Sequence, residues 1–181
     1  MIEGPNQAIC KSIWLDNRKL FATVPGSSCN HQAWPGGYQD HIAEGMNFLV
    51  VLYDTLCALR PLPFSLSDAL VVFYFHDFEK LWKYEVTSSG AVVPIAALEK
   101  KLAQHQFRLN KLIEYGIVLT PEQENAMKYV EGEGADYSRT ERKMGELAAL
   151  CHLADCASAR LFPLHPWETN DAWTGASRAR T

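Results

Sequence analysis

The stretch that decides the fold is LVVFYFHDFEKLW, residues 70–82, in which a His-Asp pair interrupts an otherwise apolar run. Apolar side chains on every face indicate a helix that is buried inside the protein. Burying an ionisable side chain is costly unless the group finds a partner or a cation. His76 and Asp77 therefore mark the end of a buried helix as a candidate site for chemistry.

Two further apolar segments carry an ionisable residue in the same way. His41 lies near the start of residues 36–54, GGYQDHIAEGMNFLVVLYD, and apolar steps of three and four predict a helix over 40–59. Asp155 lies inside residues 147–161, LAALCHLADCASARL, although aspartate is a poor helix former. Two imidazoles and two carboxylates form a ligand set that Zn, Mn, Fe, Co or Ni accepts. We therefore predict one divalent metal ion bound by His41, His76, Asp77 and Asp155.

The remaining patterns predict more helices and little strand. Ser65 to Asp68 can cap the central helix, which should end near His76. We expect an extended segment at 91–94, followed by a long amphipathic helix over 95–115 that Gly116 caps. A further helix should run from Thr120-Pro121 to Val130. A capping box at Ser138–Glu141 should open the last helix, which runs to residue 162. The sum is an all-α, single-domain helical bundle.

The ends of the chain carry weaker patterns than its middle. Residues 1–30 mix short apolar stretches with a turn-rich segment, and we expect an N-terminal arm with short strands or a first helix. Residues 163–181 are polar and rich in small side chains, which indicates an irregular tail. The helical domain itself should span residues 31–162.

Composition limits the classes of partner. The 181 residues are 48% hydrophobic and 21% charged, as in an ordinary soluble domain, and the net charge of −4 argues against a long nucleic-acid partner. The start MIEGPNQAICKS lacks the features of a secretory signal, and no apolar run reaches the length of a membrane span. Five cysteines, an odd number, indicate reduced thiols. We expect a cytoplasmic protein without a membrane partner.

The order H…HD…D over residues 31–162 resembles the HD-domain superfamily of metal-dependent phosphohydrolases. HQAWPGGYQDH at 31–41 is similar to the GG-x-x-x-H motif of many members, and HDFEK at 76–80 resembles the HD-x-x-K variant. CHLADCASARL at 151–161 is similar to the usual helix of the last ligand. The chain is also similar to small HD proteins of phage genomes. The resemblance implies a bundle of the HD-domain type.

The resemblance also implies an activity. The substrate would be a small nucleotide, a nucleoside triphosphate or monophosphate, and the ion would activate a water molecule for attack on phosphorus. Asp77 and Lys80 would be the catalytic residues. One alternative is a phosphodiesterase of cyclic nucleotides or short oligonucleotides. A second is an inactive HD-type module that binds nucleotides or regulates, although the intact ligand set argues against it. A homo-oligomer is compatible with either activity.

Departures from the family pattern qualify these expectations. Members with two metals carry further histidines before the last helix, whereas MKYVEGEGADYS at 127–138 has none. Glu131 or Glu133 could substitute as a second-metal ligand or as an acid–base group, but one ion is the simpler prediction. Members that cleave 5′-monophosphates often have an acid where this chain has Lys80. A lysine can instead bind a substrate phosphate.

Two other groups near the predicted ligands have alternatives that stay open. His31 could bind substrate or carry a second ion, and an ordinary loop histidine is an equally good interpretation. A competing metal site would use Cys151, His152, Asp155 and Cys156. At helical spacing these four residues fall on two different faces, so we expect core thiols rather than a second site.

Overall fold

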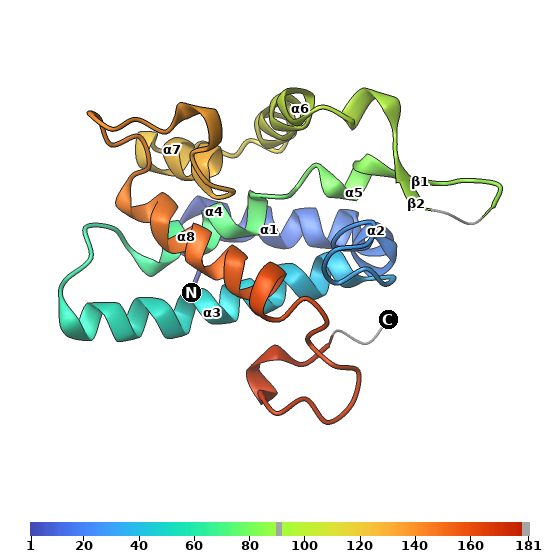
Figure 1. The fold of residues 1–181 in the computed structure, drawn as a ribbon, viewed down its shortest axis with the longest axis horizontal. Helices are drawn as coiled ribbons and strands as arrows, with labels where there is room; N and C mark the ends of the chain where they lie inside the picture. Colours follow the sequence, from blue (N-terminus) through green and yellow to red (C-terminus); the bar gives the residue numbers. More distant parts are fainter. Residues whose placement is uncertain (90–91, 179–181) are drawn as a thin grey trace.

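Helices make up most of the protein in the computed structural model, which describes residues 1–89 and 92–178 (Figure 1). The helices are α1 (Pro5–Asp16), α2 (Arg18–Thr23), α3 (Gly37–Leu59), α4 (Leu66–Phe75), α5 (Lys80–Lys83), α6 (Lys101–Glu114), α7 (Pro121–Tyr129) and α8 (Glu146–Cys156). Within the described ranges the only sheet is a hairpin in which β1 (Tyr84–Val86) pairs antiparallel with β2 (Val92–Pro94). The prediction of a helical protein is confirmed at this level.

The core forms around α4. Its side chains from Ala69 to Phe73, together with Phe75, are at most 2% exposed, as the all-round apolar pattern predicts. Helices α3, α7 and α8 pack against it. The predicted capping box starts this helix, since Ser65 Oγ accepts from the Asp68 amide while the Asp68 carboxylate accepts from the Ser65 amide. The prediction that α4 ends at His76 is also confirmed.

The first thirty residues contain two helices, α1 and α2, and no strand, and residues 24–30 are irregular. Ile13 of α1 is fully buried and Phe21 of α2 is 2% exposed, so both helices bury apolar side chains in the common core. Tyr74 of α4 donates its hydroxyl to the carbonyl of Cys10 at 3.0 Å. The segment predicted as an arm therefore packs against the central helix.

The predicted helix over 95–115 is wrong in its first third. The Ile95 amide donates to the Lys83 carbonyl at 2.8 Å, which ties the segment to the end of α5 beside the hairpin. A 3₁₀ turn at Ala96–Leu98 follows, and α6 begins only at Lys101. The end is as predicted, because Gly116 adopts a left-handed φ of 75°. Val92–Pro94 is extended as expected, while Ala91 lies outside the described residues.

The last helix begins later than the sequence predicts. Ser138 Oγ does accept from the Glu141 amide, but only as a local turn. Asn125 of α7 holds the next residues out of helical geometry, since its side chain donates to the Lys143 carbonyl and accepts from the Gly145 amide. α8 therefore starts at Glu146, and its far end continues as a π-helical stretch, Ala157–Leu161.

The C-terminal segment is mostly irregular, as expected, yet it packs against α3. Its one 3₁₀ turn within the described residues is Thr174–Ala176, and Ala176 is 3% exposed. The ring of Trp173 lies 4.8 Å from the ring of Phe48, centroid to centroid. Residues 179–181 of the predicted tail lie outside the described residues.

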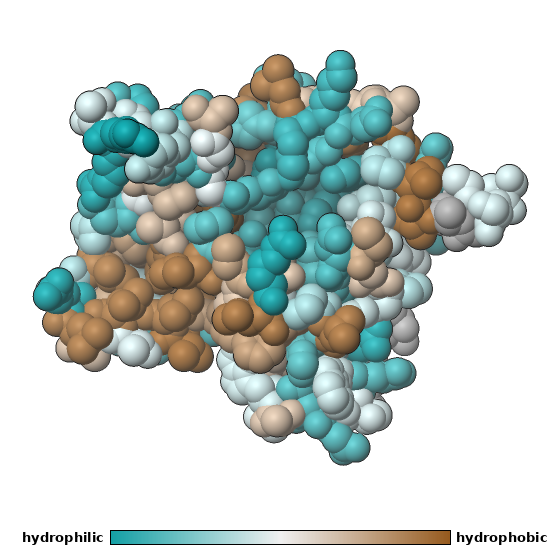
Figure 2. Space-filling model, viewed as in Figure 1, coloured by the Kyte–Doolittle hydropathy of each residue, from teal (hydrophilic) through white to brown (hydrophobic). Residues whose placement is uncertain are grey.

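α3 is the one helix of the described residues that is long and apolar enough to cross a membrane, by length and composition alone. The 18-residue stretch of α3 that is apolar enough to span a membrane has a mean hydropathy of 1.4, and 22% of that stretch is buried inside the protein. The first half of α3 carries the buried ionisable side chains of His41 and Glu44, and the helix packs against α4 and α8. The second half exposes Val51 and Leu59. Figure 2 shows an apolar surface at lower left, on the side where the end of α3 lies in Figure 1.

Candidate metal centre

Two glycines let the loop before α3 approach the helix start. Gly36 adopts a left-handed φ of 78°. A Cβ on Gly37 would lie 1.8 Å from the carbonyl oxygen of Gln32, so no other residue fits there. The Pro-Gly-Gly turn that the sequence showed thus fixes the first turn of α3 against the loop, with His41 one turn further on.

A third glycine brings the two histidine-bearing helices together. A Cβ on Gly45 would lie 2.1 Å from the ring of Phe73, which means that α3 and α4 touch at this point. The Phe73 ring in turn lies 4.4 Å from the ring of His76 and 5.9 Å from the ring of His41. The close approach therefore sets both imidazoles beside each other, with centroids 5.4 Å apart.

His41, His76 and Asp155 form a compact group whose ligand atoms lie within 4.8 Å of one another and could hold a metal ion. His41 Nε2 lies 3.3 Å from His76 Nε2 and 3.3 Å from Asp155 Oδ1. His76 Nε2 lies 3.5 Å from the same carboxylate oxygen. Both histidines are fully buried. This set of nitrogen and oxygen donors suits a divalent transition metal.

The outer nitrogens of both rings are engaged, so both Nε2 atoms face inward. His76 Nδ1 donates to the Phe73 carbonyl at 2.7 Å, and His41 Nδ1 lies 3.0 Å from Ser158 Oγ. A metal-binding histidine commonly uses its second nitrogen in this way, because the hydrogen bond fixes the ring and its tautomer.

Protonation states show how strongly the group attracts positive charge. Burial alone would lower the pKa of His76, but the Asp77 and Asp155 carboxylates raise it to about 10. Burial would raise the pKa of Asp155, yet the neighbouring His41 and His76 rings hold it well below its usual range. Burial lowers the pKa of His41. The inward-facing atoms therefore share a proton unless a cation replaces it.

Asp77 joins this group from the end of α4 and also pairs with Lys80. Its Oδ2 lies 3.2 Å from His76 Nε2, 3.7 Å from His41 Nε2 and 2.5 Å from Lys80 Nζ. Burial would raise the pKa of Asp77, but Lys80 and His76 hold it well below its usual range. Burial would lower the pKa of Lys80, and Asp77 raises it. Lys80 itself is 7% exposed.

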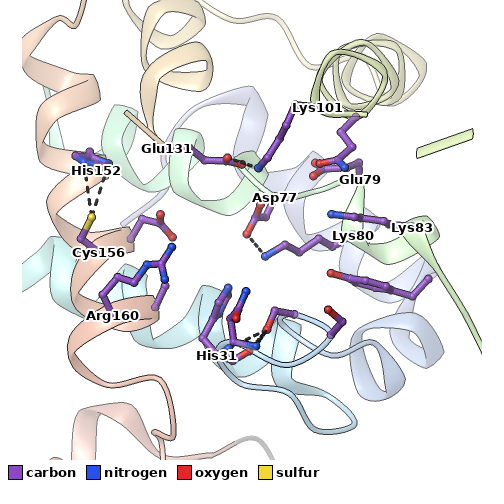
Figure 3. A pocket seen from close by; sticks show the side chains of 17 residues that line it. His31, Asp77, Glu79, Lys80, Lys83, Lys101, Glu131, His152, Cys156 and Arg160 are labelled. Carbon is purple, nitrogen blue, oxygen red and sulfur yellow. Dashed lines mark hydrogen bonds and ion pairs between the residues drawn. The ribbon is translucent and has the colours of Figure 1, made fainter. Parts of the chain in front are cut away.

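A pocket of about 380 Å³ opens above this cluster. Figure 2 shows it as a hydrophilic hollow near the middle of the view, and Figure 3 shows charged side chains pointing into it from several elements. The cations that line it are Lys80, Lys83, Lys101 and Arg160, and the acids are Asp77, Glu79, Glu131 and Asp155. Lys83 and Arg160 have no ion-pair partner among the described residues.

The other predicted site residues separate into two groups. His31 lines the pocket, and its ring lies 4.9 Å from that of His41. Burial, with Lys80 and His41, lowers its pKa to about 4, so it is neutral at pH 7. Glu131 also lines the pocket and pairs with Lys101. Glu133 does not line it, because its carboxylate accepts from the Met144 amide at 2.9 Å.

The competing cysteine set divides differently from the prediction, because Asp155 lines the same pocket as His152 and Cys156 and only Cys151 is a core thiol. Cys151 is fully buried, and its thiol points toward the Ala69 carbonyl in the core. Cys156 and His152 line the pocket instead, with Sγ 3.6 Å from Nε2. These four residues do not converge on one point.

Two buried contacts escaped the sequence analysis. Glu79, 1% exposed, lies 3.4 Å from the Nε of Arg108, a residue of α6 that is 5% exposed. Glu44, 2% exposed, accepts from the Ser158 hydroxyl at 2.8 Å, and burial raises its pKa to about 7 although that hydrogen bond opposes the rise. A lone glutamate in an apolar helix was the only available signal for Glu44.

Comparisons of the chain with protein-family models, with curated proteins and with solved structures found no match. The residues of the pocket and their arrangement are therefore the basis for assigning a function.

Proposed function

We propose that this chain is a metal-dependent phosphohydrolase acting on a small nucleotide. The observation that carries the proposal is the convergence of His41, His76 and Asp155, of which Asp155, like the neighbouring Asp77, lines a pocket whose wall carries cations. A cation site alone would suit many reactions. The basic side chains around it favour an anionic substrate, and phosphate is the anion that lysine and arginine commonly bind.

In this proposal the three converging residues and Asp77 hold one divalent ion of the Mn, Fe, Co, Ni or Zn group. Such an ion lowers the pKa of a water molecule and polarises a phosphoryl oxygen when it is bound. The two imidazoles present Nε2 inward because their Nδ1 atoms are engaged elsewhere. His41, His76 and Asp77 are buried, while the Asp155 side chain is 18% exposed and faces the pocket.

Lys80 has the placement expected of a phosphate-binding group. Its ammonium carries three donors and the Asp77 contact uses one of them, so the others remain for a substrate oxygen. Charge neutralisation at that oxygen would assist attack on phosphorus and departure of the leaving group. His31, neutral and beside the centre, can hydrogen-bond the same substrate.

The remaining wall suits the rest of a nucleotide. Lys83 and Arg160 have no carboxylate partner within the described ranges, so they are available to further phosphates. The volume of about 380 Å³ falls in the range of small-molecule sites. The net charge of −4 over the whole chain disfavours a long nucleic acid as the substrate.

The test is a substrate and metal screen. Metal-stripped protein, reloaded in turn with Mn, Fe, Co, Ni, Zn and Mg, is assayed against nucleoside mono-, di- and triphosphates, cyclic nucleotides and short oligonucleotides. We expect release of phosphate or pyrophosphate from one nucleotide class with a transition metal. Cleavage of cyclic or oligomeric substrates alone would indicate a phosphodiesterase. Tight nucleotide binding without turnover under any metal would indicate an inactive binding module.

A further inference from the structure

The two histidines of the centre are supported in different ways. His76 Nδ1 donates to a backbone carbonyl, that of Phe73, which no side-chain substitution removes. His41 Nδ1 instead meets a side chain, the hydroxyl of Ser158, at 3.0 Å. Ser158 is itself fully buried. The orientation of His41 therefore depends on one hydroxyl group.

That hydroxyl is oriented by a carboxylate. Ser158 Oγ lies 2.8 Å from Glu44 Oε2, and a carboxylate can only accept, so the serine proton points to Glu44. The oxygen lone pairs of Ser158 are then free to accept from His41 Nδ1–H. Gln32 adds a further donor to Glu44 Oε2 at 3.2 Å. In this chain His41 Nδ1 donates to Ser158 Oγ, and the Ser158 hydroxyl donates to the Glu44 carboxylate. The neutral His41 ring therefore carries its proton on Nδ1, and its Nε2 faces the centre without a proton.

The backbone around Ser158 is unusual in a way that serves this contact. Ser158 lies in the π-helical stretch Ala157–Leu161, three residues after Asp155 on the same continuous segment. π-Helical turns occur often at functional sites, because the wider turn changes the direction of side chains. This stretch packs directly against α3, the helix that carries both His41 and Glu44. The segment 155–161 thus supplies Asp155 as a candidate ligand and Ser158 as the residue that supports His41, another candidate ligand.

We propose that Ser158 and Glu44 form a positioning relay that holds His41 in its metal-binding tautomer and so strengthens binding of a divalent cation. Neither Ser158 nor Glu44 lines the pocket above the centre. Ser158 lies between His41 and Glu44, so Glu44 acts on His41 only through the serine hydroxyl. The relay deepens the proposed metal site and rests on it. Its test needs no substrate, so it can fail while phosphohydrolase activity stands.

The test is a titration of metal-stripped protein with Co²⁺ at about pH 8, above the pKa of Glu44, followed by the visible d–d absorption of the ion. Ser158→Ala should weaken Co²⁺ binding about 10- to 100-fold, as loss of an outer partner of a metal-bound histidine typically does. Glu44→Gln keeps the shape of the side chain and should weaken it less. Ser158→Thr, which keeps a hydroxyl at this position, should bind Co²⁺ with an affinity closer to that of the wild type than to that of Ser158→Ala.

A second measurement reads the tautomer directly. In metal-free protein with ¹⁵N-labelled histidine, the wild type should show His41 protonated at Nδ1, and Ser158→Ala should shift the proton toward Nε2. Ser65→Ala is the matched control, because it removes the N-cap hydroxyl of α4 far from the centre. It should lower thermal stability while Co²⁺ affinity stays at the wild-type value.

Two outcomes would overturn the relay. Equal Co²⁺ affinity in Ser158→Ala and wild type would show that the hydroxyl does not position His41. A loss of affinity in Ser65→Ala as large as that in Ser158→Ala would show that general destabilisation is the cause. If Ser158→Ala does not fold, Glu44→Gln with an unchanged His41 tautomer and unchanged affinity would contradict the proposal in the same way.

Discussion

The floor and the wall of the pocket are built differently. The floor consists of His41, His76, Asp77 and Asp155, on α3, the end of α4, and α8; the two imidazoles are fully buried, and their Nε2 atoms lie 3.2–3.7 Å from the carboxylate oxygens. The wall carries Lys83, Lys101 and Arg160 on α5, α6 and the π-helical stretch, and these side chains are half-buried or exposed. The floor is compact and mostly buried, whereas the cations of the wall are more exposed.

Under the proposed function, this difference would separate two tasks. A buried ionisable group that loses its partner is left uncompensated, so each floor residue should be indispensable. An exposed charge is screened by water and salt, so each wall residue should contribute little on its own. The floor should therefore decide whether the reaction occurs, and the wall should adjust which anion binds. The following predictions test that separation.

The largest effect should come from Asp77→Ala. We expect it to remove both the metal and the phosphohydrolase activity while helicity stays nearly unchanged, because the carboxylate is needed by the cation rather than by α4. Metal analysis, activity and circular dichroism measure the three quantities. Asp136→Ala, which removes an exposed carboxylate paired with Lys128, is the control and should change none of them. A full metal content in Asp77→Ala would show that Asp77 is not needed to hold the ion.

The next largest effect should come from pH. A metal ion must displace the proton of His76, whose pKa without a cation is about 10. The affinity for the metal ion should therefore fall about tenfold for each pH unit as the pH decreases from 9 to 7. The carboxylates and His41 have lowered pKa values and should add no further protons. Calorimetry in buffers of different ionisation enthalpy would count the released proton. A pH-independent affinity would contradict the prediction.

The same shift has a consequence for the metal-free protein. The pKa of His76 is raised in the folded state from its ordinary 6.5, so the proton stabilises the fold fully below about pH 6.5. That contribution should be lost as pH rises from 6.5 to about 10. Thermal unfolding of metal-stripped protein across this range should show a falling midpoint, and loading with metal should flatten the dependence.

Lys80 lies between floor and wall and should have an intermediate effect. Lys80→Ala should retain the ion and lower kcat about tenfold or more, roughly 1.4 kcal/mol of transition-state stabilisation, because its charge would act on phosphate. KM should rise as well if the substrate ground state also uses the charge. Steady-state kinetics and metal analysis decide the matter. Parameters within about twofold of wild type, below roughly 0.5 kcal/mol, would make Lys80 a merely structural partner of Asp77.

The smallest effect should come from the wall alone. Arg160→Ala should raise KM about threefold, or roughly 0.7 kcal/mol, with kcat unchanged, and added salt should shrink the difference. Lys128→Ala removes a cation paired with Asp136 outside the pocket and is the matched control. A kcat loss in Arg160→Ala as large as that in Lys80→Ala would show that the division between floor and wall is wrong.

The candidate floor was visible in the sequence because buried charge leaves a local trace. His76, Asp77 and Asp155 interrupt apolar helices, and each interruption costs free energy unless something compensates it. The helix boundaries at Ser65, Thr120 and Gly116 were equally visible, because capping side chains and left-handed glycines act over three or four residues.

The wrong predictions concern segments that distant residues hold. The turn at Ser138 was identified, yet Asn125 of α7 keeps the residues after it out of the helix. The start of the helix over 95–115 was misplaced because the Ile95 amide bonds to Lys83. A capping pattern reports what a segment favours by itself, and two or three tertiary hydrogen bonds are enough to override it.

The sequence by itself determined that the chain is helical, where most helices end, and which ionisable residues interrupt apolar helices, because periodicity, capping and the cost of burial act within a few residues. Only the tertiary structure decided what surrounds those residues. Ser158 meets His41 across 117 positions and Glu44 across 114, and Gly45 admits the Phe73 ring that sets the two histidines side by side. Such contacts depend on how whole helices pack, and packing is a property of the assembled core rather than of any one segment.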